Sequence, residues 1–171
     1  QEGNLGSGTL ETLAVKELED GRISSYRELK KQFPQIEMSP DEINNIYSQL
    51  IYLEELGKLK EIREEVKIPV TEEICQSAYE SYLIPRNKAS LKLIKELIDA
   101  TGVKPRKNDR IKELIGTIYA PRPSDIEISE LEGLDELFDI YSDSELAVLV
   151  QKSALDANRI DKFAHLWNRS S

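Results

Sequence analysis

Apolar residues recur every three to four positions along most of this chain, which is the spacing of amphipathic helices. In residues 9–20, for example, Leu10, Leu13, Ala14 and Leu18 share one helical face. The same spacing predicts further helices over residues 25–33, 40–56, 71–82, 91–100, 110–119, 129–141, 142–154 and 156–168. The fold class predicted from the pattern is therefore mainly α, and no sequence repeat of solenoid length is visible.

Residues that favour helix ends support several of these boundaries. Ser39 stands directly before Pro40, and two acidic residues follow, which is typical of a helix start. Gly21, Gly57 and Gly102 are each expected to end the helix before them. Ser142 and Glu145 have the spacing of a capping box, so helix 142–154 is expected to begin at Ser142.

The pattern changes after Gly57. Residues 58–62 and 66–70 each fit a short strand, and the polar residues between them fit a tight turn, so one small β-hairpin is predicted. Three helices followed by a hairpin make residues 9–70 resemble the winged-helix family. Within them, residues 53–59 (LEELGKL) resemble the end of the third helix running into the wing. A single long helix over residues 41–66 also fits the sequence and stays the alternative.

The winged-helix resemblance implies an N-terminal module whose third helix enters the major groove in the DNA-binding members. Residues 40–56 contain no lysine or arginine, although Asn45 and Gln49 have side chains that read base edges. Contacts to phosphate supply much of the affinity in such complexes. We therefore expect this module to pack against protein in preference to DNA.

Residues 90–119 resemble the SAP motif, a helix, an extended loop and a second helix that binds duplex DNA in its family. The matching residues are Leu91, Leu93, Ile94, Leu97 and Ile98 in the first helix, Gly102 and Val103 at its end, and 112–115 (KELI) in the second. The loop departs from the family pattern because it is longer and carries Asn108 where glycine is common. The resemblance implies a DNA-binding element in the middle of the chain.

Charge points to the same loop. The net charge of −9 argues against general binding of polyanions, but residues 86–112 hold nine lysines and arginines against three acids. The candidate DNA-binding residues are Lys104, Arg106, Lys107, Arg110 and Lys112, at a predicted helix N-terminus whose amides also favour phosphate. The alternative is that this loop pairs with residues 122–171, which hold five basic and eleven acidic residues.

Motifs for catalysis, metals and cofactors are missing from the sequence. It has no phosphate-binding loop, no dinucleotide fingerprint and no zinc motif. Cys75 is the only cysteine and His165 the only histidine, so neither an internal disulfide nor a zinc site within one chain is expected. Both residues fit apolar packing positions. We therefore expect no catalytic residue, no metal, no cofactor and no small-molecule substrate, and hence no enzyme.

The predicted domain organisation has four parts: a linker or vector-derived remnant (1–8), a winged-helix-like module (9–70), a helical module with the SAP-like element (71–120) and an acidic helical module (121–171). No apolar stretch approaches the roughly 20 residues that span a bilayer, and no secretory leader is evident. A cytoplasmic protein is expected, or a nuclear one in a eukaryote.

The leading hypothesis from the sequence is a non-enzymatic, DNA-associated accessory protein that binds duplex DNA through the basic loop and also binds a protein partner. The alternative is a protein-interaction adaptor, or a subunit of a larger complex, without direct DNA contact. The two differ in whether the side chains of residues 104–112 are exposed to solvent or folded onto the acidic residues 125–143.

Overall fold

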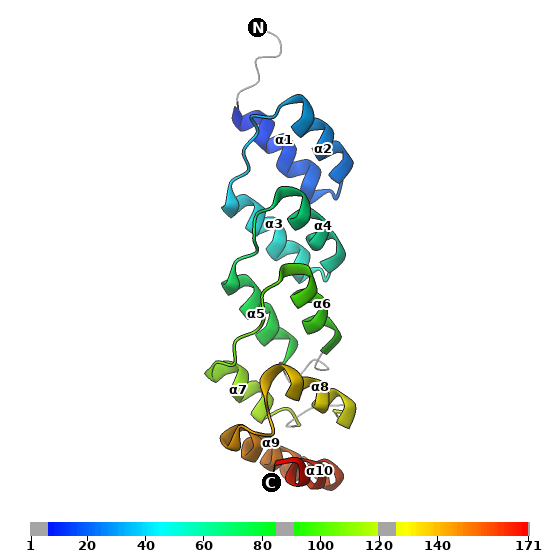
Figure 1. Ribbon diagram of the computed structural model, residues 1–171, viewed down its shortest axis with the longest axis vertical. Helices are drawn as coiled ribbons and strands as arrows, with labels where there is room; N and C mark the ends of the chain where they lie inside the picture. Colours follow the sequence, from blue (N-terminus) through cyan, green and yellow to red (C-terminus); the bar gives the residue numbers. More distant parts are fainter. Residues whose placement is uncertain (1–6, 85–90, 120–125, 171) are drawn as a thin grey trace. The chain divides into compact units, whose positions relative to one another are not determined.

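The computed structural model describes residues 7–84, 91–119 and 126–170 (Figure 1). Ten helices and no strand occur in these residues. The chain divides into two compact units, Gln1–Ile74 with Asp99–Val103 (unit 1) and Cys75–Ile98 with Lys104–Ser171 (unit 2). The predicted linker, up to residue 6, lies outside the described residues.

Unit 1 is built from two helical hairpins. The first consists of α1 (Ser7–Glu19) and α2 (Ile23–Gln32), and the second of α3 (Pro40–Tyr52) and α4 (Leu56–Val66). Helix α1 packs on α3 and α2 packs on α4, so that the two hairpins are stacked (Figure 1). This is the geometry of helical repeat proteins, formed without a visible sequence repeat, because stacking needs only apolar residues at helical spacing.

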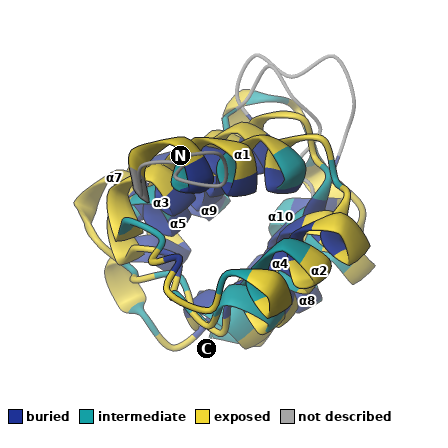
Figure 2. Ribbon diagram, turned by 90° about the horizontal axis from the view of Figure 1, so that it is seen from above, coloured by how far each residue is buried: buried dark blue, intermediate teal, exposed yellow. Residues whose placement is uncertain are grey.

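The core of unit 1 follows the predicted apolar faces. Each helix has a buried and an exposed side (Figure 2). The fully buried side chains of unit 1 are Ala14, Leu18, Ile43, Tyr47, Leu59 and Ile62. Tyr47 keeps its hydroxyl satisfied by donating a hydrogen bond to the carbonyl of Ile68 at 2.7 Å. Burial raises the pKa of Tyr47 to about 12, so it stays neutral.

The predicted β-hairpin, and with it the winged-helix-like module, is wrong. Residues 58–62 belong to α4, in which Leu56, Leu59 and Ile62 are buried at intervals of three residues, the spacing of a helix face. The alternative of one long helix is wrong as well. The chain turns between α3 and α4 at residues 53–55, where Glu54 has a left-handed φ of 59°. That turn lets α4 pack back on α3.

Gly57 allows a direct test that residues 56–66 form a helix. The sequence pattern placed it at the end of a helix, but it lies in the first turn of α4, without a positive φ and with open space around its Cα. Gly57→Ala is therefore expected to raise the free energy of unfolding by about 0.4–1 kcal/mol. Gly102 does have a positive φ of 73°, so Gly102→Ala should lower stability. Urea denaturation of both variants measures this, and a destabilised Gly57→Ala protein would contradict the helix.

Unit 2 contains most of α5 (Glu72–Tyr82) and α6 (Leu91–Thr101), and all of the four helices that follow: α7 (Asp109–Gly116), α8 (Ile128–Phe138), α9 (Ser144–Asp156) and α10 (Ile160–Ser170). Helix α9 packs against both α7 and α10. Helices α7 and α9 lie close together at Gly116, where an added Cβ would lie only 3.0 Å from the Cβ of Leu149. Helices were predicted in all six places.

Several predicted boundaries in unit 2 are shifted by a few residues, among them the start of the helix predicted at Ser142. Helix α9 begins at Ser144, and its N-cap is Asp143, whose carboxylate accepts a hydrogen bond from the backbone N–H of Leu146 at 3.1 Å. The Ser142 hydroxyl bonds to the carboxylate of Asp139 instead of capping the helix. An aspartate is as good an N-cap as a serine, so the sequence pattern allowed either start.

Candidate functional site

The basic loop (residues 104–108) is held in place by a buried side chain. Gln76 of α5 is 7% exposed, and its carboxamide forms two hydrogen bonds with the backbone of Arg106. Its Nε2 donates to the Arg106 carbonyl at 2.9 Å, and its Oε1 accepts from the Arg106 N–H at 2.8 Å. The main chain of the loop is thereby fixed, and the Arg106 side chain is exposed to solvent.

The loop ends in an asparagine that caps α7. The Asn108 side chain accepts a hydrogen bond from the Ile111 N–H at 2.9 Å and donates one to Glu80 at 3.3 Å. Along the loop before Asn108, exposed and partly buried residues alternate. Lys104 and Arg106 are exposed, and Pro105 and Lys107 are partly buried. Two of the five candidate residues thus project from the loop as exposed cations.

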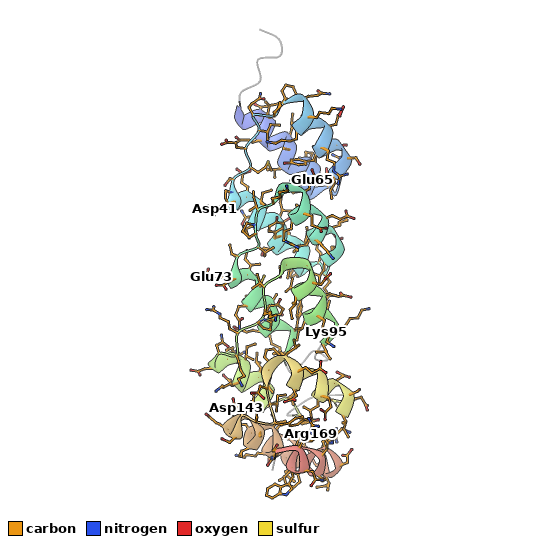
Figure 3. The ribbon with its side chains drawn as sticks, viewed as in Figure 1. Asp41, Glu65, Glu73, Lys95, Asp143 and Arg169 are labelled. Carbon is orange, nitrogen blue, oxygen red and sulfur yellow. The ribbon has the colours of Figure 1, made fainter. Side chains whose placement is uncertain are left out.

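The other three candidates are paired inside unit 2. Lys107 Nζ lies 3.0 Å and Lys112 Nζ 3.5 Å from the same carboxylate oxygen of Asp143. Arg110 pairs with Glu113 one turn further along α7 at 3.2 Å. Figure 3 shows Asp143 at the start of α9. The expected pairing between the basic loop and the acidic C-terminal residues is therefore present for two of the cations.

Asp143 has the electrostatic environment of a structural carboxylate. The hydrogen bond from the Leu146 N–H, followed by the hydrogen bond and charge of Lys107, lowers its pKa below the ordinary aspartate value. It is therefore ionised at neutral pH, and its negative charge is shared by Lys107 and Lys112. Lys104, Arg106 and Arg110 are the exposed cations that an anion can meet here.

Helix α3, the third helix of the predicted winged-helix module, carries acidic residues where the basic loop carries cations. Asn45 and Gln49 on α3 are exposed, and the first turn of the helix carries Asp41 and Glu42. Asp41 lies at the N-terminal end of α3 (Figure 3). This helix offers no cation that would attract a phosphate.

A second surface stands out on the C-terminal helices. Among the described residues, nine large apolar side chains are exposed, and five of them lie on α9 or α10: Val148, Leu149, Leu155, Ile160 and Trp167. On α10, the exposed Ile160 and Trp167 form one row with Phe163 and Ala164. We call these four residues the α10 stripe. Ile160 and Trp167 are each 60% exposed.

The α10 stripe has a defined shape. The rings of Phe163 and Trp167 lie with their centroids 6.0 Å apart. Beside them is an open cavity of about 310 Å³ lined by Phe163, Ala164, Trp167 and Asn168. All four lining residues belong to α10, so this is an open hollow on the surface of one helix.

The opposite side of α10 is fixed by a polar cluster. Glu132 of α8 accepts hydrogen bonds from His165 Nε2 at 2.7 Å and from the Tyr141 hydroxyl at 3.1 Å, and it pairs with Arg169 at 3.3 Å. The Arg169 guanidinium also lies 4.6 Å above the Tyr141 ring, a cation–π contact. These contacts hold α10 against α8 and leave the α10 stripe facing solvent.

Glu132 makes this cluster sensitive to acid. Burial opposes its ionisation, but the hydrogen bonds from His165 and Tyr141 and the charge of Arg169 lower its pKa below the ordinary glutamate value. A lowered folded-state pKa stabilises the fold above the unfolded pKa, and that stabilisation is lost as pH falls through the folded pKa.

We therefore expect Glu132→Gln to have a lower melting temperature than the wild type at neutral pH, and the difference to shrink as pH falls through the lowered folded-state pKa of Glu132. Glu136→Gln is the matched control, because Glu136 is exposed on the same helix. Thermal denaturation followed by circular dichroism measures both. A difference between wild type and Glu132→Gln that does not change with pH would contradict the assignment.

Unit 1 has an open cavity of about 680 Å³ between the start of α2 and α4. Its two arginines are already paired, Arg22 with Glu17 at 2.7 Å and Arg27 with Glu65 at 2.6 Å. Glu61 and Glu64 line the same cavity. With its cations paired and acids around it, this cavity is a poor anion site.

Two features are absent from residues 7–84, 91–119 and 126–170. No group of three or more metal-ligating side chains occurs there. No helix in that part of the chain has the length and apolar character to cross a membrane. His165 is partly buried, but it lies in the polar cluster with Glu132 and Tyr141 and not in the apolar packing position expected from the sequence.

Sequence reasoning missed the α10 stripe. Its residues recur at the spacing of a helix face, which is also the spacing of an ordinary core, so the pattern alone gave no sign that they are exposed. Gln76 was missed too, since a glutamine among apolar residues carries no signal of a buried contact.

A scan against protein-family models finds no match for this chain, and neither curated proteins nor solved structures show a similar one.

Proposed function

We propose that this chain is a non-enzymatic adaptor that binds a partner protein through the α10 stripe. The observation that supports it most is the exposure of Ile160 and Trp167 on one face of α10, with an open hollow beside Trp167. Exposed apolar surface on a folded protein is typical of interaction sites, and tryptophan is enriched at their energetic centres. The stacked hairpins of unit 1 fit the same role, since helical repeat proteins commonly bind other proteins along their surfaces.

An affinity experiment tests this function. The tagged chain is used to capture proteins from an extract of the cells that make it, as wild type, as Ile160→Ser with Trp167→Ser, and as Leu53→Ser. Leu53 has the same 60% exposure as Ile160 but lies at the end of α3. We expect a partner that is lost with the α10 double variant and kept with Leu53→Ser. A partner retained by all three would contradict a role of the α10 stripe.

DNA binding through the basic loop is the second candidate function. It is favoured by the way Gln76 fixes Arg106, with Lys104 and Arg106 exposed on the loop. A fluorescence anisotropy titration with labelled duplex at about 50 mM salt tests it. This candidate predicts binding that weakens steeply with salt, with a slope reduced by about two in Lys104→Ala with Arg106→Ala. If the chain is an adaptor without DNA contact, we expect no saturable binding of the duplex.

The compartment is part of the same proposal. Cys75, the only cysteine of the chain, is buried in α5, which fits the reducing environment of the cytoplasm, or of the nucleus in a eukaryote. No small-molecule substrate or cofactor is proposed. The proposed adaptor acts by binding alone. Substitutions in the α10 stripe should therefore change the affinity for the partner.

A further inference from the structure

Two lysine side chains converge on one negatively charged oxygen at the junction of the basic loop and α7. Lys107 Nζ lies 3.0 Å and Lys112 Nζ 3.5 Å from the same carboxylate oxygen of Asp143, the N-cap of α9. Phosphate oxygens make charge-assisted contacts of the same kind with lysines. The two ammonium groups therefore form an anion site, and a carboxylate of the chain itself occupies it.

Both sides of this contact are held in place. The backbone of Arg106, directly before Lys107, is fixed by Gln76. Lys107 Nζ also donates to the Asp139 carbonyl at 3.3 Å. The Asp143 carboxylate caps α9, and this hydrogen bond, followed by the contact with Lys107, lowers its pKa below the ordinary aspartate value. The carboxylate stays charged in mild acid, so a competing anion is needed to displace it from the lysines.

Three exposed cations surround the occupied site. Lys104 and Arg106 project from the basic loop, and Arg110 lies in the first turn of α7. Arg110 pairs with Glu113, but this pair is exposed, and surface ion pairs are weak. The two lysines of the occupied site extend this group to five cations, of which two share the charge of the carboxylate.

We infer that Asp143 is an autoinhibitory residue, whose carboxylate holds the place between Lys107 and Lys112 that a phosphate of duplex DNA takes. This inference rests on the second candidate function, DNA binding through the basic loop, and adds its regulation. While Asp143 is in place, the three exposed cations alone attract phosphate, and its displacement adds two phosphate contacts. A duplex offers many phosphates at once, so it competes with the carboxylate better than a single small anion does.

Asp143→Asn separates the charge of this residue from its structural role. Asparagine is an equally good N-cap, so α9 keeps its start while the competing charge is lost. We expect the variant to bind a labelled duplex at least about tenfold more tightly than the wild type at about 50 mM salt. Its affinity should also fall more steeply with salt, with a slope larger by about two. Fluorescence anisotropy of the full chain measures both quantities.

Glu145→Gln is the matched control. It changes the net charge by the same amount in the first turn of α9, but Glu145 is exposed and is not the acid that pairs with the two lysines. Its affinity for the duplex should stay within about twofold of the wild type, with an unchanged salt slope. Asp143→Ser also keeps an N-cap and should repeat the effect of Asp143→Asn, while circular dichroism checks that the helix content is kept.

Lys112→Ala gives a second, independent readout. In the wild type, the charge of Lys112 is shared with Asp143, so its removal should leave the affinity and the salt slope almost unchanged. In the Asp143→Asn background, the freed lysine contacts phosphate, so the same change should lower the salt slope by about one. Equal effects of Lys112→Ala in the two backgrounds would contradict competition by Asp143.

The outcomes separate this inference from DNA binding itself. If the wild type binds and neither Asp143 variant binds more tightly, or if Glu145→Gln gains as much, the inference is overturned and the DNA candidate stands. Binding that occurs only in the two Asp143 variants supports the inference, because the carboxylate then blocks the site completely. If neither the wild type nor the variants bind the duplex, both the inference and the DNA candidate fail.

Discussion

Replacing Gln76 by leucine is expected to lower the free energy of unfolding of unit 2 by about 1–3 kcal/mol. The leucine keeps the volume of the side chain, but it removes both hydrogen bonds to Arg106, at 2.8 and 2.9 Å. The Arg106 N–H loses its partner, while the Arg106 carbonyl keeps a hydrogen bond from the Asn108 N–H at 2.9 Å. A buried polar group that loses its partner costs more than an ordinary hydrogen bond contributes. Chemical denaturation of wild type and variant measures the loss.

Arg106→Ala is the matched control for this prediction. It removes the exposed side chain and keeps the backbone that Gln76 binds, so stability should change by no more than about 0.5 kcal/mol. Equal effects of the two variants would mean that the guanidinium, and not the carboxamide contact, stabilises the loop. An unchanged stability of Gln76→Leu would contradict the role of Gln76.

The second large effect is expected at Asn44 in unit 1. This buried residue of α3 donates through Nδ2 to the carbonyls of Pro40 and Pro69, and its Oδ1 accepts from the Thr71 N–H at 2.9 Å. It therefore ties the segment after α4 to α3. Asn44→Leu should lower the free energy of unfolding by about 2–3 kcal/mol, because the Thr71 N–H and the Pro69 carbonyl lose a partner.

Asn45→Leu serves as its control. Asn45 is the next residue along α3, but it is exposed. Its replacement should change stability by about 0.5 kcal/mol or less in denaturation by urea. If the two asparagines prove equally sensitive, α3 does not have the orientation described here.

The sequence predicted where helices occur in unit 2 and in the first half of unit 1, because their apolar residues repeat at helical spacing. It failed at residues 58–70. There the short run KLKEI has Leu59 and Ile62 three residues apart, and alternating polar and apolar neighbours made it look like a strand. The turn at Glu54 could not be foreseen, since a left-handed glutamate has no sequence signal comparable to that of glycine.

The candidate site could be predicted only in part. The cluster of cations at residues 104–112 is visible in the sequence, but which of them are exposed depends on partners far along the chain. Lys107 and Lys112 pair with Asp143, which is more than thirty residues away in sequence. The acidic C-terminal residues suggested such pairing in general. Neither the carboxylate involved nor the exposure of Trp167 follows from spacing or charge.

The most direct test of the adaptor function is site-specific photo-crosslinking in the cells that make the chain. A photoreactive amino acid is placed at Ala164, in the middle of the α10 stripe, at Arg106 in the basic loop, and at Leu53 in unit 1 as control. Our proposal predicts one defined protein adduct from position 164 and none from position 53. Adducts to nucleic acid from position 106 with none from position 164, or equal adducts from positions 164 and 53, would contradict it.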